Sequence, residues 1–113
     1  MKKDDGAFLK HMRDAILRIT EYTANVGHDE FIKQPMMQDA VIRQIEIMGE
    51  ATKSLSAALK TKYPDVPWKD IAGMRDKLIH GYFGVDIEAV WDTVEQDISE
   101  LLEKIEKIFE NLD

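Results

Sequence analysis

Residues 86–111 read DIEAVWDTVEQDISELLEKIEKIFEN, and this stretch decides the class of fold. Its apolar residues recur every three or four positions, which is the spacing of one face of an α-helix. Asp86 is a good N-cap at its start, and the opposite face is acidic. The apolar stripe includes Ile87, Val90, Trp91, Val94, Ile98, Leu101, Leu102, Ile105 and Ile108. Because the stripe also resembles a coiled-coil seam, it either faces the protein's own core or continues in part into a dimer interface.

Three further helical stretches precede this one. Apolar residues at helical spacing predict helices over about residues 5–26 and 35–60. A shorter helix is predicted over about residues 68–82, after a loop whose prolines cannot lie within one regular helix. Residues 28–33 could form one turn or a brief helix. Together these patterns predict an all-α, antiparallel four- to five-helix bundle that fills a single domain, residues 1–113.

The composition narrows the class of protein. A chain of 113 residues can bury a modest core, and chains of this size often gain stability by pairing with themselves. The absence of cysteine excludes disulfides and thiolate metal sites. No apolar run approaches the roughly 18–20 residues that span a bilayer, and the first residues, MKKDD, lack the apolar stretch of a signal peptide. We therefore expect a cytoplasmic protein with no cofactor and no metal of its own.

The net charge of −7 is unevenly distributed along the chain. Residues 51–84 carry 6 basic and 3 acidic residues, whereas residues 85–113 carry 2 basic and 10 acidic residues. A phosphate-bearing ligand would therefore bind near the cations of the basic middle third, which are Lys53, Lys60, Lys62, Lys69, Arg75 and Lys77. The alternative is that these cations form a solvated face.

Several other polar or special residues have less specific interpretations. Gly49 lies inside a predicted helix, where glycine costs about 1 kcal/mol relative to alanine, and its small size would allow a close helix crossing. Glu46 and Glu50 lie one turn apart, but no histidine stands at the Glu-x-x-His spacing of di-iron bundles. We interpret both as helix surface or as part of a structural ion pair. His11 and His28 show no convincing partner and are predicted to be exposed.

The run MRDKLIHGY, residues 74–82, is the segment best suited to chemistry. On a regular helix Asp76 and His80 lie four residues apart and can touch. Arg75 and Tyr82 share a neighbouring face, whereas Arg75 and His80 do not share one, since each residue turns the helix by about 100°. Two copies of the helix facing each other could combine two arginines and two histidines in one cleft. A symmetric dimer site is therefore plausible from geometry.

These residue types suit the cleavage of RNA. Histidine transfers protons near neutral pH, and the fork of an arginine matches phosphate oxygens. RNA carries its own nucleophile, the 2′-hydroxyl, so a histidine and an arginine could cleave it without a metal. The alternative from spacing alone is that Arg75 pairs with an acidic residue while His80 caps a helix end.

The motif resembles the signature of one protein family. The chain has an arginine (Arg75), four intervening residues, a histidine (His80), and a tyrosine (Tyr82) two positions later. This pattern resembles the Arg–His signature of HEPN domains, in the form found in the HepT branch of that family. The likeness covers about residues 5–110. Matching segments, in the same order and spacing, are residues 43–51 (RQIEIMGEA), 64–68 (PDVPW) and 85–91 (VDIEAVW).

The resemblance implies a function as well as a fold. It implies a helical bundle that dimerises with the two motifs in one cleft, and a metal-independent endoribonuclease toxin acting on RNA, including transfer RNA in some members. The implied partner is a minimal nucleotidyltransferase antitoxin that transfers AMP from ATP onto Tyr82. Carried over to this chain, Arg75 would stabilise the phosphate, His80 would be the general acid and base, and Asp76 would assist.

One residue of the implied site departs from the family pattern. Many relatives have asparagine where this chain has Asp76, and a carboxylate there would repel RNA unless it paired with Arg75 or a protonated His80. For an RNA ligand, Lys53, Lys69 and Lys77 are the expected phosphate contacts. The alternative function is a non-catalytic helical subunit that a nucleotidyltransferase binds and modifies.

Overall fold

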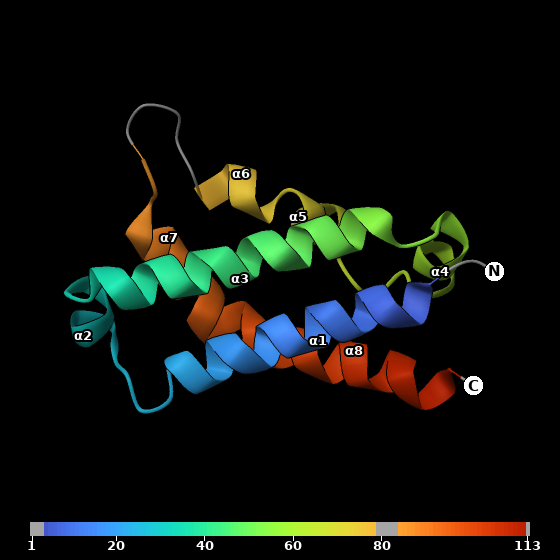
Figure 1. Ribbon diagram of the computed structural model, residues 1–113, viewed down its shortest axis with the longest axis horizontal. Helices are drawn as coiled ribbons and strands as arrows, with labels where there is room; N and C mark the ends of the chain where they lie inside the picture. Colours follow the sequence, from blue (N-terminus) through green and yellow to red (C-terminus); the bar gives the residue numbers. More distant parts are fainter. Residues whose placement is uncertain (1–3, 79–83, 113) are drawn as a thin grey trace.

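The computed structural model describes residues 4–78 and 84–112. Within these residues the chain is helical, and the helices pack into an elongated bundle (Figure 1). The elements are α1 (Asp5–Tyr22), α2 (His28–Ile32), α3 (Pro35–Ser54), α4 (Ala57–Lys62), α5 (Trp68–Ala72), α6 (Met74–Leu78), α7 (Ile87–Asp92), the π-helical segment η2 (Thr93–Asp97) and α8 (Ile98–Asn111). The predicted all-α bundle is confirmed.

Helix α3 is the element around which the others are arranged. It packs along α1, and α1 in turn packs against α8 (Figure 1). Helices α5 and α6 follow one another along a different side of α3, and α2 and α7 also contact α3. The motif helix α6 is therefore supported directly by the longest helix of the bundle.

The core lies between these helices. Each fully buried apolar side chain contributes roughly 1.5–3 kcal/mol relative to its exposed state. Those with no exposed surface are Leu9, Met12, Ala15, Ile16, Ile19, Phe31, Val41, Met48, Val90 and Ile105. The stripe predicted for residues 86–111 contributes Val90, Ile98, Leu101, Ile105 and Ile108 to this core. These residues of the stripe therefore face the protein's own core.

The helix predicted over residues 35–60 is two helices, α3 and α4, with a corner at Leu55. The corner forms because Ser56 is an N-cap: its Oγ accepts a hydrogen bond from the backbone N–H of Leu59 at 3.1 Å. Asp5 at the start of α1 strengthens it. Its carboxylate accepts hydrogen bonds from the Ser56 backbone N–H at 2.9 Å and from the Ser56 hydroxyl at 2.6 Å. The prediction of one continuous helix was wrong here.

The other predicted helices also contain interruptions. The stretch predicted over residues 68–82 contains two helices, α5 and α6, which are separated by Gly73. Its last residues lie outside those described. The stretch over residues 86–111 is helical as predicted, and Asp86 is its N-cap, with Oδ1 accepting from the Ala89 backbone N–H at 3.0 Å. The π-helical turn η2 lies within it.

Gly49 brings α3 and α5 close together, as its position in the sequence indicates. A β-carbon built there would lie 3.4 Å from the backbone oxygen of Ile71 and 3.5 Å from that of Ala72. A β-carbon would thus already touch the α5 backbone, and a larger side chain would push α5 away. The glycine therefore sets the distance between α3 and the α5–α6 segment.

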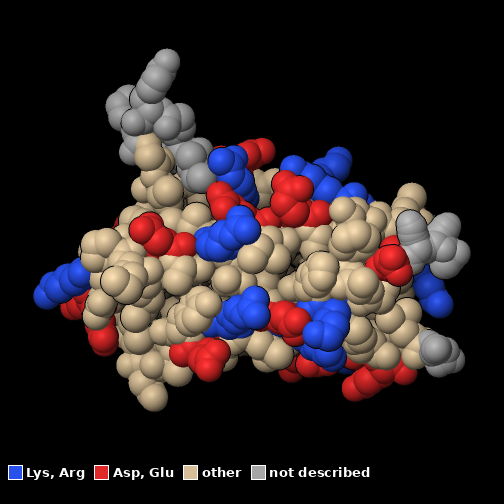
Figure 2. All heavy atoms as spheres, viewed as in Figure 1, with Lys and Arg blue, Asp and Glu red and all other residues tan. Residues whose placement is uncertain are grey.

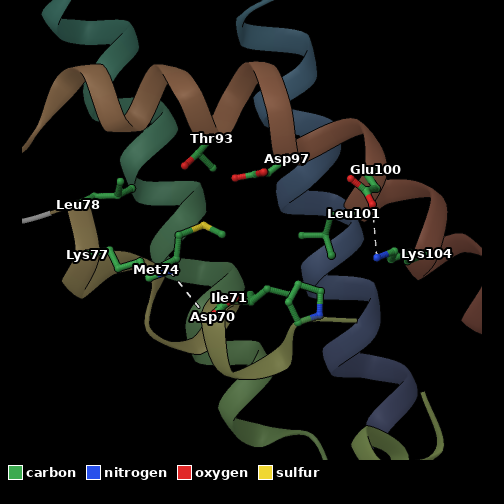
Figure 3. Close-up of a pocket in the computed structure, with 11 residues that line it drawn as sticks. Asp70, Ile71, Met74, Lys77, Leu78, Thr93, Asp97, Glu100, Leu101 and Lys104 are labelled. Carbon is green, nitrogen blue, oxygen red and sulfur yellow. Dashed lines mark ion pairs between the residues drawn. The ribbon is translucent and has the colours of Figure 1, made fainter. Parts of the chain in front are cut away.

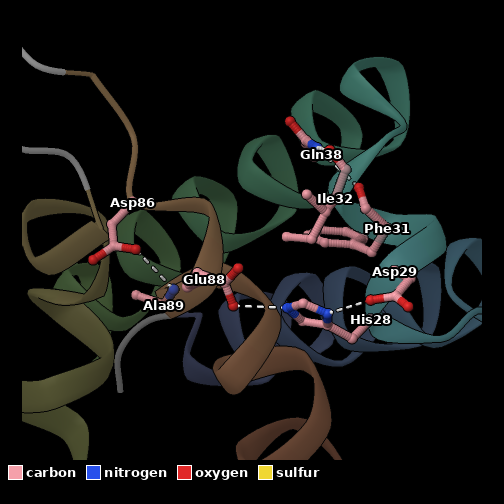
Figure 4. A network of polar contacts seen from close by, with 8 residues as sticks. All are labelled: His28, Asp29, Phe31, Ile32, Gln38, Asp86, Glu88 and Ala89. Carbon is pink, nitrogen blue, oxygen red and sulfur yellow. Dashed lines mark hydrogen bonds and ion pairs between the residues drawn. The ribbon is translucent and has the colours of Figure 1, made fainter.

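His28 links α2 to α7, which the sequence did not predict (Figure 4). It is partly exposed, as expected, but it has two carboxylate partners. Its Nε2 lies 2.8 Å from Oε1 of Glu88 on α7, and its Nδ1 lies 3.1 Å from Oδ1 of Asp29. The hydrogen bond with Glu88, followed by that with Asp29, raises the pKa of His28 above 6.5. Protonation therefore strengthens the contact between α2 and α7.

Thermal stability should depend on His28 near neutral pH. Because the folded protein binds this proton more tightly, the stabilisation is complete below the unfolded pKa of about 6.5 and is lost as pH rises through the higher folded value. We expect Tm to fall from about pH 6 to pH 8, and His28→Gln to reduce that slope. The matched control is His11→Gln, which removes a histidine whose ring packs against Phe8. This variant should keep the wild-type slope. Equal slopes for His28→Gln and wild type would contradict the link.

Candidate active site

Arg75, the first residue of the predicted motif, lies on α6 facing α3. Its Nε donates a hydrogen bond to Oε2 of Glu46 on α3 at 3.0 Å. Its Nη1 lies 3.5 Å from Oδ1 of Asp76. The Arg75 side chain is still 52% exposed, so it is held in place without being enclosed. Among the described residues, its remaining nitrogen, Nη2, donates no hydrogen bond.

Glu46 connects Arg75 to a second arginine. Its other carboxylate oxygen, Oε1, lies 3.7 Å from Nη1 of Arg43, one turn earlier on α3. The Glu46 side chain is 29% exposed, whereas that of Arg43 is 70% exposed. The sequence interpretation of Glu46 as part of a structural ion pair is consistent with these contacts. Its pairing with Arg75 was missed, although Glu46 and Gly49 share one face of α3.

A small recess lies beside this pair, between α3 and the α5–α6 segment. Its volume is about 140 Å³. It is lined by Glu46, Gly49, Glu50, Lys53, Ala72, Arg75 and Asp76. Lys53 is one of the predicted RNA contacts, and its Nζ lies 3.8 Å from Oε2 of Glu50. Two cations and three carboxylates therefore share the recess.

The other predicted residues lie in different places. Asp76 is 81% exposed and contacts Arg75, which is one of the two pairings that would offset its charge. Lys69 is exposed on α5. Lys77 faces another side of α6, with Nζ 3.9 Å from Oδ1 of Asp70. His80 and Tyr82 lie outside the described residues.

The basic middle third does not form an uninterrupted basic surface in the view of Figure 2. Blue and red groups alternate over α3, α5 and α6. On these same helices, ion pairs join Arg75 to Glu46, Lys53 to Glu50 and Lys77 to Asp70. The local excess of positive charge read from the sequence is therefore partly neutralised by carboxylates on the same helices.

A second cavity lies on the other side of α6 (Figure 3). Its volume is about 220 Å³, and it separates α5 and α6 from η2 and α8. Ile71, Met74, Leu78 and Leu101 supply apolar walls, and Asp97 from the π-helical turn points into it. Burial is the main cause that raises the pKa of Asp97 above its ordinary value. No motif in the sequence indicated this cavity, because a π-turn leaves no distinct apolar period.

The described residues lack two features that would indicate other functions. No helix in the described part of the chain is both long enough and apolar enough to cross a membrane. Residues 4–78 and 84–112 also contain no group of three or more histidine, aspartate or glutamate side chains placed to hold a metal ion.

Known proteins resemble this chain over most of its length. A protein of Methanocaldococcus jannaschii, whose name combines a gamma-glutamylcyclotransferase with a suggested RNase, is 48% identical over all 113 residues. A protein of Thermococcus cleftensis named a probable ribonuclease HepT is 43% identical over 96% of the chain. A protein of Caldanaerobacter subterraneus, also named as a suggested RNase, is 39% identical over 96% of the chain.

The relatives differ in how much of their own length is matched. The chain spans 51% of the M. jannaschii protein, but 98% of the T. cleftensis protein and 96% of the C. subterraneus protein. No solved structure gives a significant match. The profile of the family described as "Ribonuclease HepT-like" matches residues 12–108. This chain belongs to the HepT-like ribonuclease family.

Proposed function

We propose that this chain is a metal-independent endoribonuclease that cleaves RNA with Arg75 and His80. The observation that carries the proposal is the position of Arg75 in a chain of the HepT-like ribonuclease family. Its guanidinium is anchored through Nε and half exposed, and Nη2 donates no hydrogen bond to a described residue. A fixed, accessible guanidinium suits the binding of a phosphate, because its fork matches two phosphate oxygens.

The proposed reaction uses the 2′-hydroxyl of the RNA as nucleophile. Its oxygen attacks the adjacent phosphorus, and the bond from phosphorus to the 5′-oxygen of the next nucleotide breaks. His80 takes the proton from the 2′-hydroxyl as general base, and as general acid it gives a proton to the leaving 5′-oxygen, so that no net proton is gained or lost. Arg75 stabilises the charge that develops on the phosphate oxygens. The products are a 2′,3′-cyclic phosphate and a 5′-hydroxyl.

The site is proposed to form between two copies of the chain. On a regular helix Arg75 and His80 would not share a face, since five steps of about 100° separate them by roughly 140°. In a symmetric dimer the arginine of one copy and the histidine of the other can face the same phosphate. Asp76 would assist, and its contact with Arg75 limits its repulsion of RNA.

Purified dimer, free of any partner, should cleave RNA in the presence of EDTA. We expect fragments that end in a 2′,3′-cyclic phosphate, detected by their resistance to alkaline phosphatase until acid opens the ring. Cellular RNA that includes transfer RNA is the appropriate substrate. Correctly folded, unmodified dimer that leaves all of this RNA intact would rule out the ribonuclease and favour the non-catalytic subunit.

We propose further that the chain is the toxin of a toxin–antitoxin pair, inactivated by adenylylation of Tyr82. An adenylate adds bulk and negative charge to a site for a phosphate, so it should block RNA. Incubation with a minimal nucleotidyltransferase of the proposed antitoxin class and ATP should add the mass of one AMP per chain and stop cleavage. Tyr82→Phe should gain no mass. Modification that persists in Tyr82→Phe would show that another residue is the acceptor.

A further inference from the structure

We infer that Glu46 is a positioning residue for Arg75, an inference that rests on the proposed ribonuclease function. Glu46 itself would not touch the RNA. Its carboxylate holds Nε of Arg75 at 3.0 Å and thereby fixes where the guanidinium presents its other nitrogens. The chemistry recognised at this point is a phosphodiester oxygen of the substrate.

The contact joins a firmly packed helix to a short one. Glu46 lies on α3 between Ile45, which is 1% exposed, and Ile47, which packs against the core. Arg75 lies on α6, whose described part is the five residues Met74–Leu78. Because Gly49 lets the α5 backbone approach α3, the Glu46 side chain can reach across to α6. The fixed end of the contact is therefore Glu46.

The edge of the guanidinium that Glu46 occupies is important. A carboxylate at Nε lies on the side edge of the guanidinium, which Nε shares with one N–H of Nη2. It restrains a long side chain that otherwise has many rotamers, and it leaves the end of the fork, formed by the outer N–H groups of Nη1 and Nη2, for a ligand. Asp76 lies 3.5 Å from Nη1, a looser contact, and Nη2 donates no hydrogen bond to any of the described residues. A phosphate oxygen could bind at Nη2 without breaking the bond to Glu46. An arginine already in position needs less ordering when the transition state forms.

A different role for Glu46 would be to mask the charge of Arg75. A carboxylate beside a cation weakens the local positive potential, so a masking residue would lower activity, and its removal would raise activity. A positioning residue has the opposite effect, because its removal releases Arg75 and lowers the rate of the chemical step. The two roles therefore predict changes of opposite sign in kcat.

The test compares Glu46→Ala and Glu46→Gln with Asp39→Asn in the proposed dimer. Asp39 is an exposed carboxylate on the same helix, two turns before Glu46, and it does not line the recess. We expect Glu46→Ala to lower kcat for RNA cleavage by about tenfold or more, with KM unchanged or lower. Glu46→Gln keeps an acceptor oxygen and should retain more of kcat, and Asp39→Asn should stay within about twofold of wild type.

Circular dichroism checks the fold of each variant, and the near-isosteric Glu46→Gln serves if Glu46→Ala does not fold. A kcat that is unchanged or higher in Glu46→Ala, while wild type cleaves RNA, overturns the positioning role and leaves the ribonuclease proposal intact. A tenfold loss of kcat in Asp39→Asn as well would also overturn it, since the effect would then follow from the loss of any carboxylate on α3.

A second measurement does not require cleavage. In protein labelled with ¹⁵N-arginine, the Nε–H of Arg75 should exchange with water more slowly in wild type than in Glu46→Ala, because Glu46 accepts its hydrogen bond. Arg75→Lys identifies the resonance by its disappearance. If wild type cleaves no RNA, the ribonuclease proposal fails. The exchange rates then test only whether Glu46 holds the Nε–H of Arg75. Equal exchange in wild type and Glu46→Ala overturns the anchor, and slower exchange in wild type supports it.

Discussion

Replacing Arg75 or His80 with alanine is expected to lower the rate of RNA cleavage by about 100-fold or more. Removing one group that stabilises transition-state charge typically costs about 100- to 1,000-fold, and removing a general acid–base group costs about 100- to 10,000-fold. Arg75 is half exposed, so the loss of its ion pair should change the unfolding free energy by only about 1 kcal/mol or less. Single-turnover cleavage rates and thermal unfolding of the same samples measure both effects.

Arg43→Ala is the matched control for this experiment. Arg43 also contacts the Glu46 carboxylate, but it lies outside the motif and is 70% exposed. It should keep a cleavage rate close to that of wild type. If Arg75→Ala and His80→Ala both cleave RNA as fast as Arg43→Ala, the assignment of the catalytic residues is wrong even though the protein is a nuclease.

The largest effect on stability is expected for Phe31→Ala, at about 3–5 kcal/mol. The Phe31 side chain is fully buried, and its ring lies 5.2 Å from that of Trp91 on α7. The side-chain amide of Gln38 on α3 donates to the Phe31 backbone oxygen at 2.8 Å, so α2 is joined to both neighbours at this residue. Truncation would leave a cavity where these three helices meet. Urea unfolding should show a lower midpoint with an unchanged m-value.

Met36→Ala is the control for this truncation. Met36 is also a large apolar residue near α2, but it is 85% exposed on the first turn of α3. Its replacement should change the unfolding free energy by no more than about 0.5 kcal/mol. Similar losses for Phe31→Ala and Met36→Ala would mean that α2 is not packed into the core as described.

The helices were predictable from the sequence because burial leaves a period of three and four residues, as in Val90, Ile98 and Ile105. Their interruptions were not. The corner at Leu55, where Ser56 caps α4, depends on Asp5, which lies 51 residues from Ser56. A pattern read within a short window of sequence cannot detect such a contact. The π-helical turn at residues 93–97 changes the hydrogen-bond spacing of the backbone but not which residues are apolar, so the apolar pattern does not reveal it.

The candidate site was predictable only where its residues are close in sequence. Arg75 could be singled out because its chemistry and its place in the motif are both local. Its partner Glu46 lies 29 residues earlier, and the pair exists because α3 and α6 pack together. The link between His28 and Glu88, 60 residues apart, was missed for the same reason. His80 and Tyr82 remain predictions from the sequence and the family resemblance.

The contact of Asp5 with Ser56 has a consequence for the order of folding. It brings together residues that are 51 positions apart, so the entropy of closing that loop must be overcome before the contact contributes any stability. Helices α1 and α3 contain mostly local hydrogen bonds and can begin to form earlier. We expect the Ser56 corner to form after α1 and α3 have docked. Changes at Asp5 would then mainly accelerate unfolding and leave the folding rate almost unaffected.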